Sequence, residues 1–209
     1  MANTEGSRVI SQTVVVRKTI KYFITSRQME ILTGSLLGDA YIHPLGKICF
    51  EQTESQLAYL KWMYSEFNSL AYPKIAKVTR LDKRSGKITT SYRFFLRQIF
   101  QSWRQAWYPD NIKSIPDNLE EWFTPLSLAV WYMDDGHLNN GRAPLFASEN
   151  FTKDEASRLS NLLRKNWNLI SYINQNNRIR LSQRSTQDFV RLVEPHIVPS
   201  MRYKITLTP

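Results

Sequence analysis

Apolar positions recur at helical spacing in two short segments of this chain, residues 32–40 and 128–136. Each segment consists of apolar and small residues and reaches an acidic residue near its end, Asp39 in the first and Asp135 in the second. The two aspartates are 96 residues apart. The repeated pattern predicts two copies of one structural unit, each opening with an apolar helix that presents a carboxylate at its end.

Both helices have recognisable start signals. Thr25 and Gln28 form a capping-box pair ahead of the first helix. Thr124 is the expected N-cap of the second, with Pro125 at the first helical position, where its missing N–H costs nothing. The helices are expected to end at the two aspartates, and Gly136 is expected to supply a left-handed stop after the second.

The same succession of elements follows each helix. Alternating and helical periodicities predict a hairpin, a helix, a second hairpin and a third helix. These elements fall at residues 40–52, 55–70, 77–95 and 98–107 in the first copy, and at 139–148, 152–167, 169–182 and 186–194 in the second. The sequence therefore predicts an α+β fold of two pseudo-symmetric αββαββα halves with antiparallel sheets.

The aspartate helices are the natural join between the halves, because their small residues permit close backbone approach. These small residues are Thr33, Gly34 and Ser35 in the first helix and Ser127 and Ala129 in the second. The expected division is an N-terminal extension (1–24), a first half (25–107), a linker (108–123) and a second half with a C-terminal tail (124–209).

Composition narrows the class of protein. Hydrophobic residues make up 42% of the 209 residues, which is enough for a core, and no apolar run is long enough to span a membrane. The single cysteine, Cys49, excludes an internal disulfide and fits a reducing compartment. The net charge of +10 and the pI near 9.8 favour a polyanionic partner.

The basic residues are concentrated in the second hairpin of each half. Residues 74–97 hold eight basic side chains against Asp82 alone, and residues 156–187 contain no acid. Two such basic blocks favour nucleic acid as the partner. If the partner is DNA, alternation along a β-ribbon turns every second side chain toward a groove, although a solvated surface would also account for any single residue. The candidates for base readout are Lys77, Arg80, Lys87, Arg93, Arg178, Arg180 and Arg184, and the candidates for phosphate contact at a loop tip are Lys83 and Arg84.

The two carboxylates suggest a metal site. A lone aspartate at a helix end is usually of no consequence, but two packed helices would bring Asp39 and Asp135 together. Their combined negative charge would require cations, and oxygen-only ligands suit Mg²⁺. The backbone carbonyls of Gly38 and Asp134 are further candidate ligands. The Asp134 side chain is the weaker candidate, because consecutive helical residues point about 100° apart.

Two lysines are candidates for stabilising charge at a scissile phosphate. Lys113 precedes the second aspartate helix, and Lys204 follows the last predicted helix. By position alone each would be a surface lysine.

The motifs resemble those of the double-motif, single-chain LAGLIDADG homing endonucleases. The matching runs are LGDAYI at 37–42, TPLSLA at 124–129, MDDG at 133–136 and the Tyr203-Lys204 pair. The resemblance implies two sheets that form a DNA-binding saddle, joined by packed LAGLIDADG helices. It also implies Mg²⁺-dependent double-strand cleavage, with Mn²⁺ as the expected substitute. It maps the metal-binding acids onto Asp39 and Asp135 and the basic residues of the catalytic centre onto Lys113 and Lys204.

The resemblance has limits that leave alternatives open. Ala40 replaces a motif glycine, and the hairpins differ in length from those of relatives, so no target sequence carries over. Some relatives on this scaffold are intron-RNA splicing maturases or non-cleaving DNA-binding regulators. The expected partner is double-stranded DNA, with intron RNA as a further candidate, and no membrane. The expected state is a monomer in an organelle, mitochondrion or chloroplast, with the bacterial cytoplasm as the alternative.

Overall fold

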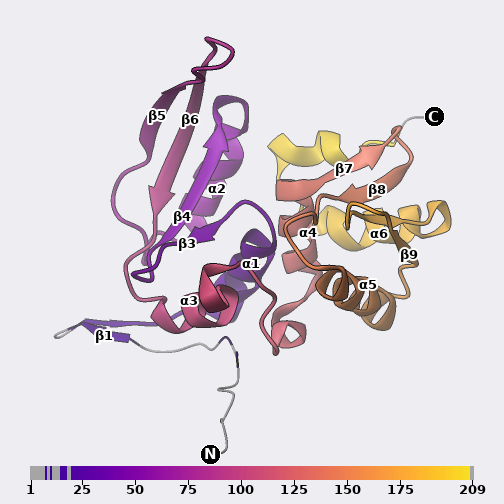
Figure 1. Ribbon diagram of the computed structural model, residues 1–209, viewed down its shortest axis with the longest axis horizontal. Coiled ribbons are helices and arrows are strands. Elements are labelled where there is room, and N and C mark those ends of the chain that lie inside the picture. The colour runs from indigo at the N-terminus through magenta and orange to yellow at the C-terminus, as the bar shows by residue number, and fades with distance from the viewer. Residues whose placement is uncertain (1–7, 9, 11–14, 18–19, 208–209) are drawn as a thin grey trace, which may run out of the picture.

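The computed structural model describes residues 8, 10, 15–17 and 20–207, and it contains the two halves that the sequence predicts. The first comprises α1 (Ser26–Leu37), β3 (Tyr41–Ile42), β4 (Ile48–Thr53), α2 (Leu57–Glu66), β5 (Ala76–Leu81), β6 (Ile88–Phe95) and α3 (Gln101–Trp107). The second comprises α4 (Pro125–Asp135), β7 (Gly136–Asn139), β8 (Ala143–Phe146), α5 (Lys153–Trp167), β9 (Ser171–Ile173), β10 (Ile179–Leu181) and α6 (Thr186–Val193). Figure 1 shows one sheet on each side of the central helices α1 and α4.

The two sheets have the same topology. Their strand orders are β3-β4-β6-β5 and β7-β8-β10-β9, and every pairing is antiparallel. A separate two-stranded ribbon is formed by β1 (Val15–Arg17) and β2 (Ile20–Tyr22). The last turn, η6 (Pro199–Ile205), follows α6 and carries Lys204. The predicted α+β class and its repeated αββαββα order are confirmed.

The predicted caps are present at both aspartate helices. The Thr25 side chain accepts from the backbone N–H of Gln28, whose side chain in turn accepts from the Thr25 N–H. At α4, Thr124 caps the backbone N–H of Ser127, and Pro125 is the first helical residue. These reciprocal bonds satisfy N–H groups that a helix start leaves without intrahelical partners.

The expected left-handed stop at Gly136 is wrong. Gly136 has φ −91° and ψ 154°, and it begins β7 directly. Glycine is required there for space, since a Cβ atom would lie 2.0 Å from a ring carbon of Tyr132. The left-handed residues of this region are instead Asn140 and Gly141, in the turn between β7 and β8.

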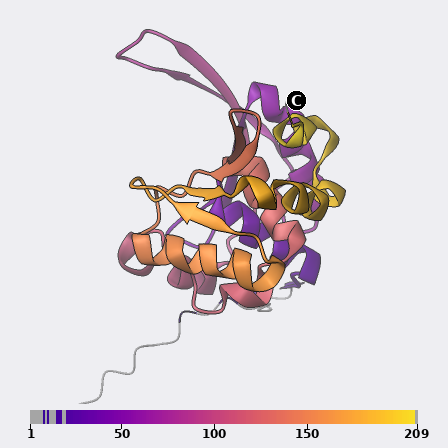
Figure 2. The same cartoon turned by 90° about the vertical axis from the view of Figure 1, so that its right-hand side faces the viewer.

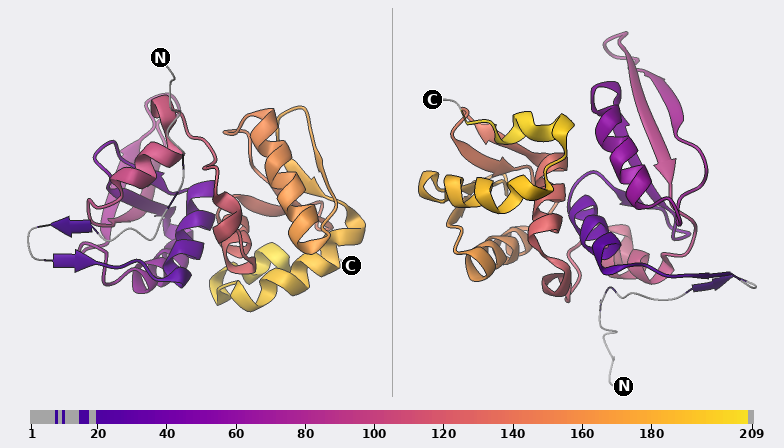
Figure 3. Two further views of the ribbon diagram at one scale, coloured as in Figure 1. Left: turned by 90° about the horizontal axis from the view of Figure 1, so that it is seen from below. Right: turned by 180° about the vertical axis from the view of Figure 1, so that it is seen from behind.

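The seam between α1 and α4 is the centre of the molecule. In Figure 3 the two helices run side by side between the sheets, and they are in direct contact. At Gly34 a Cβ atom would lie 2.3 Å from the carbonyl oxygen of Ser127 and 2.7 Å from the Cβ of Val130. The backbones are therefore as close as the small residues of the two helices suggest.

Each sheet has one covered face and one open face. In the first sheet Phe50 and Phe94 stack with ring centroids 4.8 Å apart on the helix side, and both are buried. The large aromatic side chains Trp103, Trp107 and Trp131 are also buried, so they belong to the core. The β5–β6 hairpin projects beyond the body of the protein, as Figure 2 shows from the side. Over the described residues, no helix is long and apolar enough to cross a membrane.

Candidate functional site

The two predicted carboxylates lie at one shared site. Asp135 is the last residue of α4, and Asp39 follows Gly38, the C-cap of α1. Both line one open cavity of about 410 Å³, whose other lining residues are Gly38, Ala40, Tyr41, Tyr108, Asn111, Lys113 and Asn150. The α1–α4 seam thus delivers one carboxylate from each half to the same place.

Two lysines also lie at this site, Lys113 from the linker and Lys204 from the second half, and they make equivalent contacts. The Lys113 Nζ donates to the carbonyl oxygen of Gly38 at 2.8 Å, at the end of α1. The Lys204 Nζ donates to the carbonyl oxygen of Asp134 at 3.0 Å and to that of Met133, at the end of α4. Ammonium groups at helix C-termini are favourably placed, because the last carbonyls have no intrahelical partners. The structure thus brings Asp39, Asp135 and both lysines together, and it uses the Gly38 and Asp134 carbonyls to hold the lysines.

Asp134 and Gly38 occupy equivalent positions in the two copies, and they fit together across the seam. A Cβ atom at Gly38 would lie 2.5 Å from the Cβ of Asp134. The Asp134 carboxylate lies in the space that Gly38 leaves, and its Oδ2 accepts from the N–H of Asp39 at 3.4 Å. The Asp134 side chain therefore contacts the first helix end, while Asp135 lines the cavity. The sequence argument ranked the Asp134 side chain below Asp135 from helical geometry, and it did not predict that this side chain would fill the space beside Gly38.

Gln52, near the end of β4, is a site residue that sequence reasoning missed. Its side chain is buried, and its Nε2 donates to Asp39 Oδ2 at 2.9 Å and to Asp134 Oδ1 at 3.4 Å. Gln52 therefore fixes the orientation of both carboxylates from the sheet side. The signal in the sequence was a polar residue at an inward-facing strand position, two residues after the inward-facing Phe50.

Burial and like charges govern the electrostatics of the site. Burial, reinforced by the neighbouring Asp39, raises the pKa of Asp135 to about 7, although the two lysines oppose the shift. Burial, reinforced by Asp39 and Asp135, also holds the pKa of Asp134 well above its usual range. Burial lowers the pKa of Lys113 and of Lys204, against the attraction of the carboxylates. The site thus gathers three carboxyl groups and two ammonium groups, and the raised pKa values show that ionising all three carboxyl groups together is unfavourable without a cation.

This donor set fits a divalent cation. Carboxylate and carbonyl oxygens are the ligands that Mg²⁺ prefers, and a bound cation would favour the ionised form of the carboxyl groups whose pKa burial raises. Among the described residues, no group of three or more His, Cys, Asp or Glu side chains is arranged around a common metal position. The protein ligands are therefore few, which is typical of Mg²⁺ sites that complete their coordination with water and phosphate oxygens.

In the first half, the predicted DNA-contacting residues divide between the two faces of the sheet. Arg93 lies opposite Glu51 on β4, and Arg80 forms a bidentate pair with the same carboxylate. Both arginines thus share the open face. Lys77 lies three residues before Arg80, so alternation places it on the opposite face, and its grouping with the two arginines is wrong. Lys83, Arg84 and Lys87 are exposed at the tip of the hairpin.

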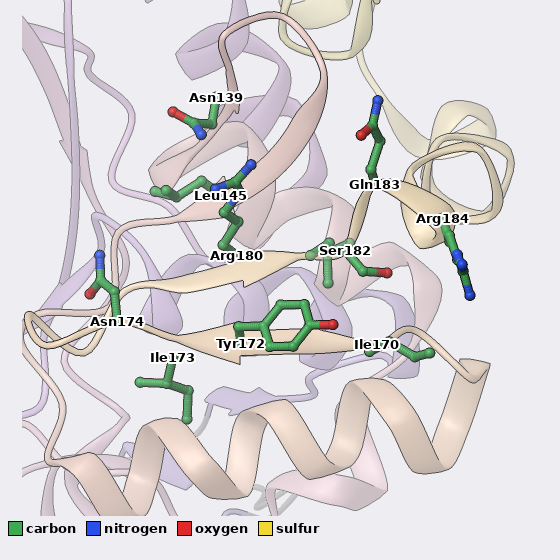
Figure 4. Close-up of a pocket in the computed structure, with 11 residues that line it drawn as sticks. Asn139, Leu145, Ile170, Tyr172, Ile173, Asn174, Arg180, Ser182, Gln183 and Arg184 are labelled. Atoms are coloured by element: carbon green, nitrogen blue, oxygen red, sulfur yellow. The ribbon is translucent and has the colours of Figure 1, made fainter.

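In the second half, the open face of the sheet is hollowed. Figure 4 shows Tyr172 and Arg180 on neighbouring strands of this face, beside Asn139 and Asn174. Arg180 and Arg184 line the open cavity of about 1030 Å³ at this place. Arg178 forms an ion pair with Glu149 instead. This face therefore offers amide, aromatic and guanidinium groups together.

The fold and the site define a class of protein in which two pseudo-symmetric halves meet at a pair of aspartate-bearing helices. The comparison with known sequences is consistent with this class. A sequence model of the LAGLIDADG DNA endonuclease family matches residues 29–189, which is most of the chain. The chain therefore belongs to the LAGLIDADG DNA endonuclease family.

Relatives and a solved structure support this membership. The structure of the homing endonuclease I-WcaI bound to its DNA recognition sequence is similar, with a TM-score of 0.79 and 26% identity, covering 89% of this chain and 88% of that one. The cytochrome b mRNA maturase bI2 of Debaryomyces hansenii is 31% identical over 87% of this chain and 74% of its own length. The maturase of the same name from Saccharomyces cerevisiae is 32% identical over 85% of this chain, and the chain spans 47% of it. The probable intron-encoded endonuclease 1 of Wickerhamomyces canadensis is 28% identical over 85% of this chain and 83% of its own length.

Proposed function

We propose that this protein is an intron-encoded homing endonuclease that makes a metal-dependent double-strand break in a long, asymmetric DNA site. The observation that carries the proposal is the convergence of Asp39 and Asp135 in one cavity, with Lys113 and Lys204 at equivalent positions beside them. A protein that only binds DNA has no need for half-buried lysines beside a half-buried carboxyl group with a shifted pKa. The DNA-bound state of the similar I-WcaI structure supports double-stranded DNA as the partner.

The roles of the residues follow from their positions. Asp39 and Asp135 would hold Mg²⁺, with Mn²⁺ as a substitute, and the carbonyls of Gly38 and Asp134 remain candidate ligands because each keeps a second lone pair. The bound ions would activate water and stabilise the leaving oxygen of the phosphodiester. Lys113 and Lys204 would stabilise negative charge that develops on the scissile phosphates. The shared site holds two equivalent pairs of one aspartate and one lysine, which suits one cut in each strand.

The open faces of the two sheets are the proposed DNA-contacting surfaces. Base contacts come from arginines on these faces, and phosphate contacts come from the loop tip at Lys83 and Arg84. The proposed set is Arg80, Lys87, Arg93, Arg178, Arg180 and Arg184, with Lys77 reassigned to a phosphate contact outside the groove-facing row. Binding neutralises several phosphates, so affinity should fall by orders of magnitude between about 50 and 200 mM salt. We also propose that the protein acts as a monomer, divided as 1–24, 25–107, 108–123 and 124–209.

Substitution of the aspartates tests the proposal. Asp39→Asn and Asp135→Asn should each abolish double-strand cleavage with Mg²⁺, while DNA binding measured by gel shift persists. Asp154→Asn, on the exposed side of α5, is the matched control and should cut like the wild type. The target is obtained by selecting cleaved sequences from a random or intron-junction DNA library. Normal cutting by either active-site variant would refute the shared centre.

A splicing cofactor is the second candidate function, because two relatives that are each more than 30% identical to this chain are named cytochrome b mRNA maturases. Their names also support an organellar setting for this chain. The discriminating assay offers the wild-type protein intronless target DNA with Mg²⁺ and, separately, the unspliced intron RNA. Cleavage at the intronless junction supports homing, whereas splicing rescue without cleavage supports the maturase role.

A further inference from the structure

Arg104, on α3, is an unusual side chain in this protein. Among the described residues it is the charged residue that is most enclosed, with 6% of its surface exposed. Its observed partners are neutral: Nη1 donates to the carbonyl oxygen of Ile42 at 2.7 Å, and Nη2 donates to Oδ1 of Asn111 at 2.8 Å. Its guanidinium also lies over the ring of Tyr108, 4.1 Å from the centroid. A buried cation without a carboxylate is costly, so its retention calls for a role.

The two hydrogen bonds of Arg104 connect the strand that follows Asp39 to the segment that precedes Lys113. Ile42 lies three residues after Asp39, and Asn111 lies two residues before Lys113. A planar guanidinium with a rigid fork of donors fixes two acceptors relative to each other, which a flexible ammonium group cannot do as well. Arg104 therefore sets the distance between the segments that carry Asp39 and Lys113.

The segment before Lys113 needs such support. Asp110 and Asn111 both have left-handed backbones, with φ values of 52° and 64°. Non-glycine residues in this region are strained and persist where the surroundings hold them. The hydrogen bond from Arg104 holds the Asn111 side chain, and it adds to the backbone hydrogen bonds of this turn, those from Asn111 N–H to Tyr108 and from Ser114 N–H to Trp107.

The second half solves the same problem with a different residue. The Tyr132 hydroxyl donates to the carbonyl oxygen of Lys204 at 3.0 Å, and the Tyr132 ring is packed edge-on against Phe146 and Phe189. The basic residue two positions before Lys204, Arg202, is exposed and lies 3.9 Å from Glu194. The surroundings of the two lysines are therefore unequal, although the lysines make equivalent contacts.

We infer that Arg104 is a positioning residue for Lys113 and that Tyr132 is its counterpart for Lys204, each acting on the cleavage of one DNA strand. The inference rests on the proposed endonuclease function. The two lysines of the pseudo-symmetric site are then held in place independently of each other. Loss of one support leaves the other half intact, so the damaged enzyme nicks one strand and accumulates open-circular DNA.

Strand-resolved cleavage tests this inference. The substrate is a supercoiled plasmid carrying one selected target, together with the same target as a duplex end-labelled on either strand, under single-turnover conditions with saturating protein. Arg104→Met should slow cleavage of one strand by roughly 10- to 100-fold, as expected for a catalytic group displaced by about 1 Å. Tyr132→Phe should slow cleavage of the opposite strand. Equal slowing of both strands in either variant would overturn the inference.

Two further variants separate positioning from folding. Asn111→Gly keeps the left-handed backbone but removes the acceptor of Arg104, so it should show the same strand bias as Arg104→Met. Arg158→Met is the matched control, since Arg158 also donates to carbonyls of the linker, those of Pro116 and Asp117, without reaching Asn111. Arg158→Met should lose thermal stability without strand bias. A bias in Arg158→Met, or its absence in Asn111→Gly, would refute a specific role for the Arg104 contact.

A readout that does not depend on cleavage distinguishes failure of this inference from failure of the proposed function. Reductive methylation with formaldehyde, followed by peptide mass spectrometry, reports how well each lysine is held. In Arg104→Met, Lys113 should be labelled several-fold faster than in the wild type while Lys204 is unchanged, and Tyr132→Phe should show the reverse. Unchanged labelling of both lysines would overturn the inference even if the wild type cuts DNA. If the labelling changes as expected but the wild type never cuts DNA, the endonuclease function is refuted instead.

Discussion

The two halves approach each other closely at Gly34, and Gly34→Ala is the sharpest test of the seam. In an isolated helix this change would stabilise the protein by about 1 kcal/mol, because alanine is the better helix former. Here the new Cβ would meet the Ser127 carbonyl oxygen at 2.3 Å, whereas ordinary contacts begin near 3.4 Å. The helices α1 and α4 must therefore separate by about 1 Å to accept the methyl group.

The net effect should be a loss of stability. Overpacking of a tight contact typically costs about 1–3 kcal/mol, which exceeds the gain in helix propensity. We expect Gly34→Ala to lower the free energy of unfolding by up to about 2 kcal/mol. Because the helices carry Asp39 and Asp135 at their ends, the same displacement should slow cleavage by roughly 100-fold.

The assay pairs urea denaturation with single-turnover cleavage of the selected target. Ile179→Val, at a buried position of β10 away from the seam, is the control, with an expected loss of about 0.5–1.5 kcal/mol. The control should cut at the wild-type rate despite its lower stability. If Gly34→Ala is as stable as the wild type and cuts normally, the close approach of the helices does not constrain the site.

Three other outcomes are expected. In EDTA at pH 8, Asp135→Asn should raise the melting temperature, because the ionised Asp135 destabilises the fold by about 1.4 kcal/mol for each unit by which its pKa is raised. Mg²⁺ should raise the melting temperature of the wild type and not that of the variant. Equal responses of the two proteins to Mg²⁺ would contradict this prediction. Burial raises the pKa of Cys49 to about 11, so at pH 8 the native thiol should react with iodoacetamide roughly 100-fold more slowly than free cysteine. The reaction should become faster as the pH rises toward 11. Fast labelling at pH 8 would contradict the prediction, because it would show that the thiol is ionised there. Arg80→Ala, on the open face, should weaken DNA binding in a gel shift more than Lys77→Ala does, and the opposite order would place the groove on the other face of the hairpin.

Local sequence signals were sufficient for the elements of the fold. Capping boxes at Thr25 and Thr124 act within one helical turn, so they determine where α1 and α4 begin regardless of the rest of the chain. Periodicity located the hairpins and outer helices in both copies, since side-chain alternation follows directly from backbone geometry. The role of Gly136 was misread, because a glycine after a helix can serve either a left-handed turn or close packing. The contact with the Tyr132 ring, which leaves no room for a Cβ atom, shows that it serves close packing.

Site residues that belong to a sequence motif were predicted. A site residue that is defined only by a contact between distant parts of the fold was missed. Overlaying the two copies pointed to Asp39 and Asp135, and the family resemblance added Lys113 and Lys204. Gln52 carries no motif of its own, and its role depends on a strand packing against both helix ends.

Signals within a few residues were enough to predict the two apolar helices, their order among the paired hairpins and the carboxylate at each helix end, because these features depend on near neighbours. Packing across the fold was needed to place Asp134 in the space left by Gly38, to bond Arg104 to Asn111 and Tyr132 to the Lys204 backbone, and to put Arg80 on the open face of the hairpin. Those contacts join residues that are mostly far apart in the chain. Their existence depends on how closely α1 and α4 pack and on strand register, which no short stretch of sequence encodes.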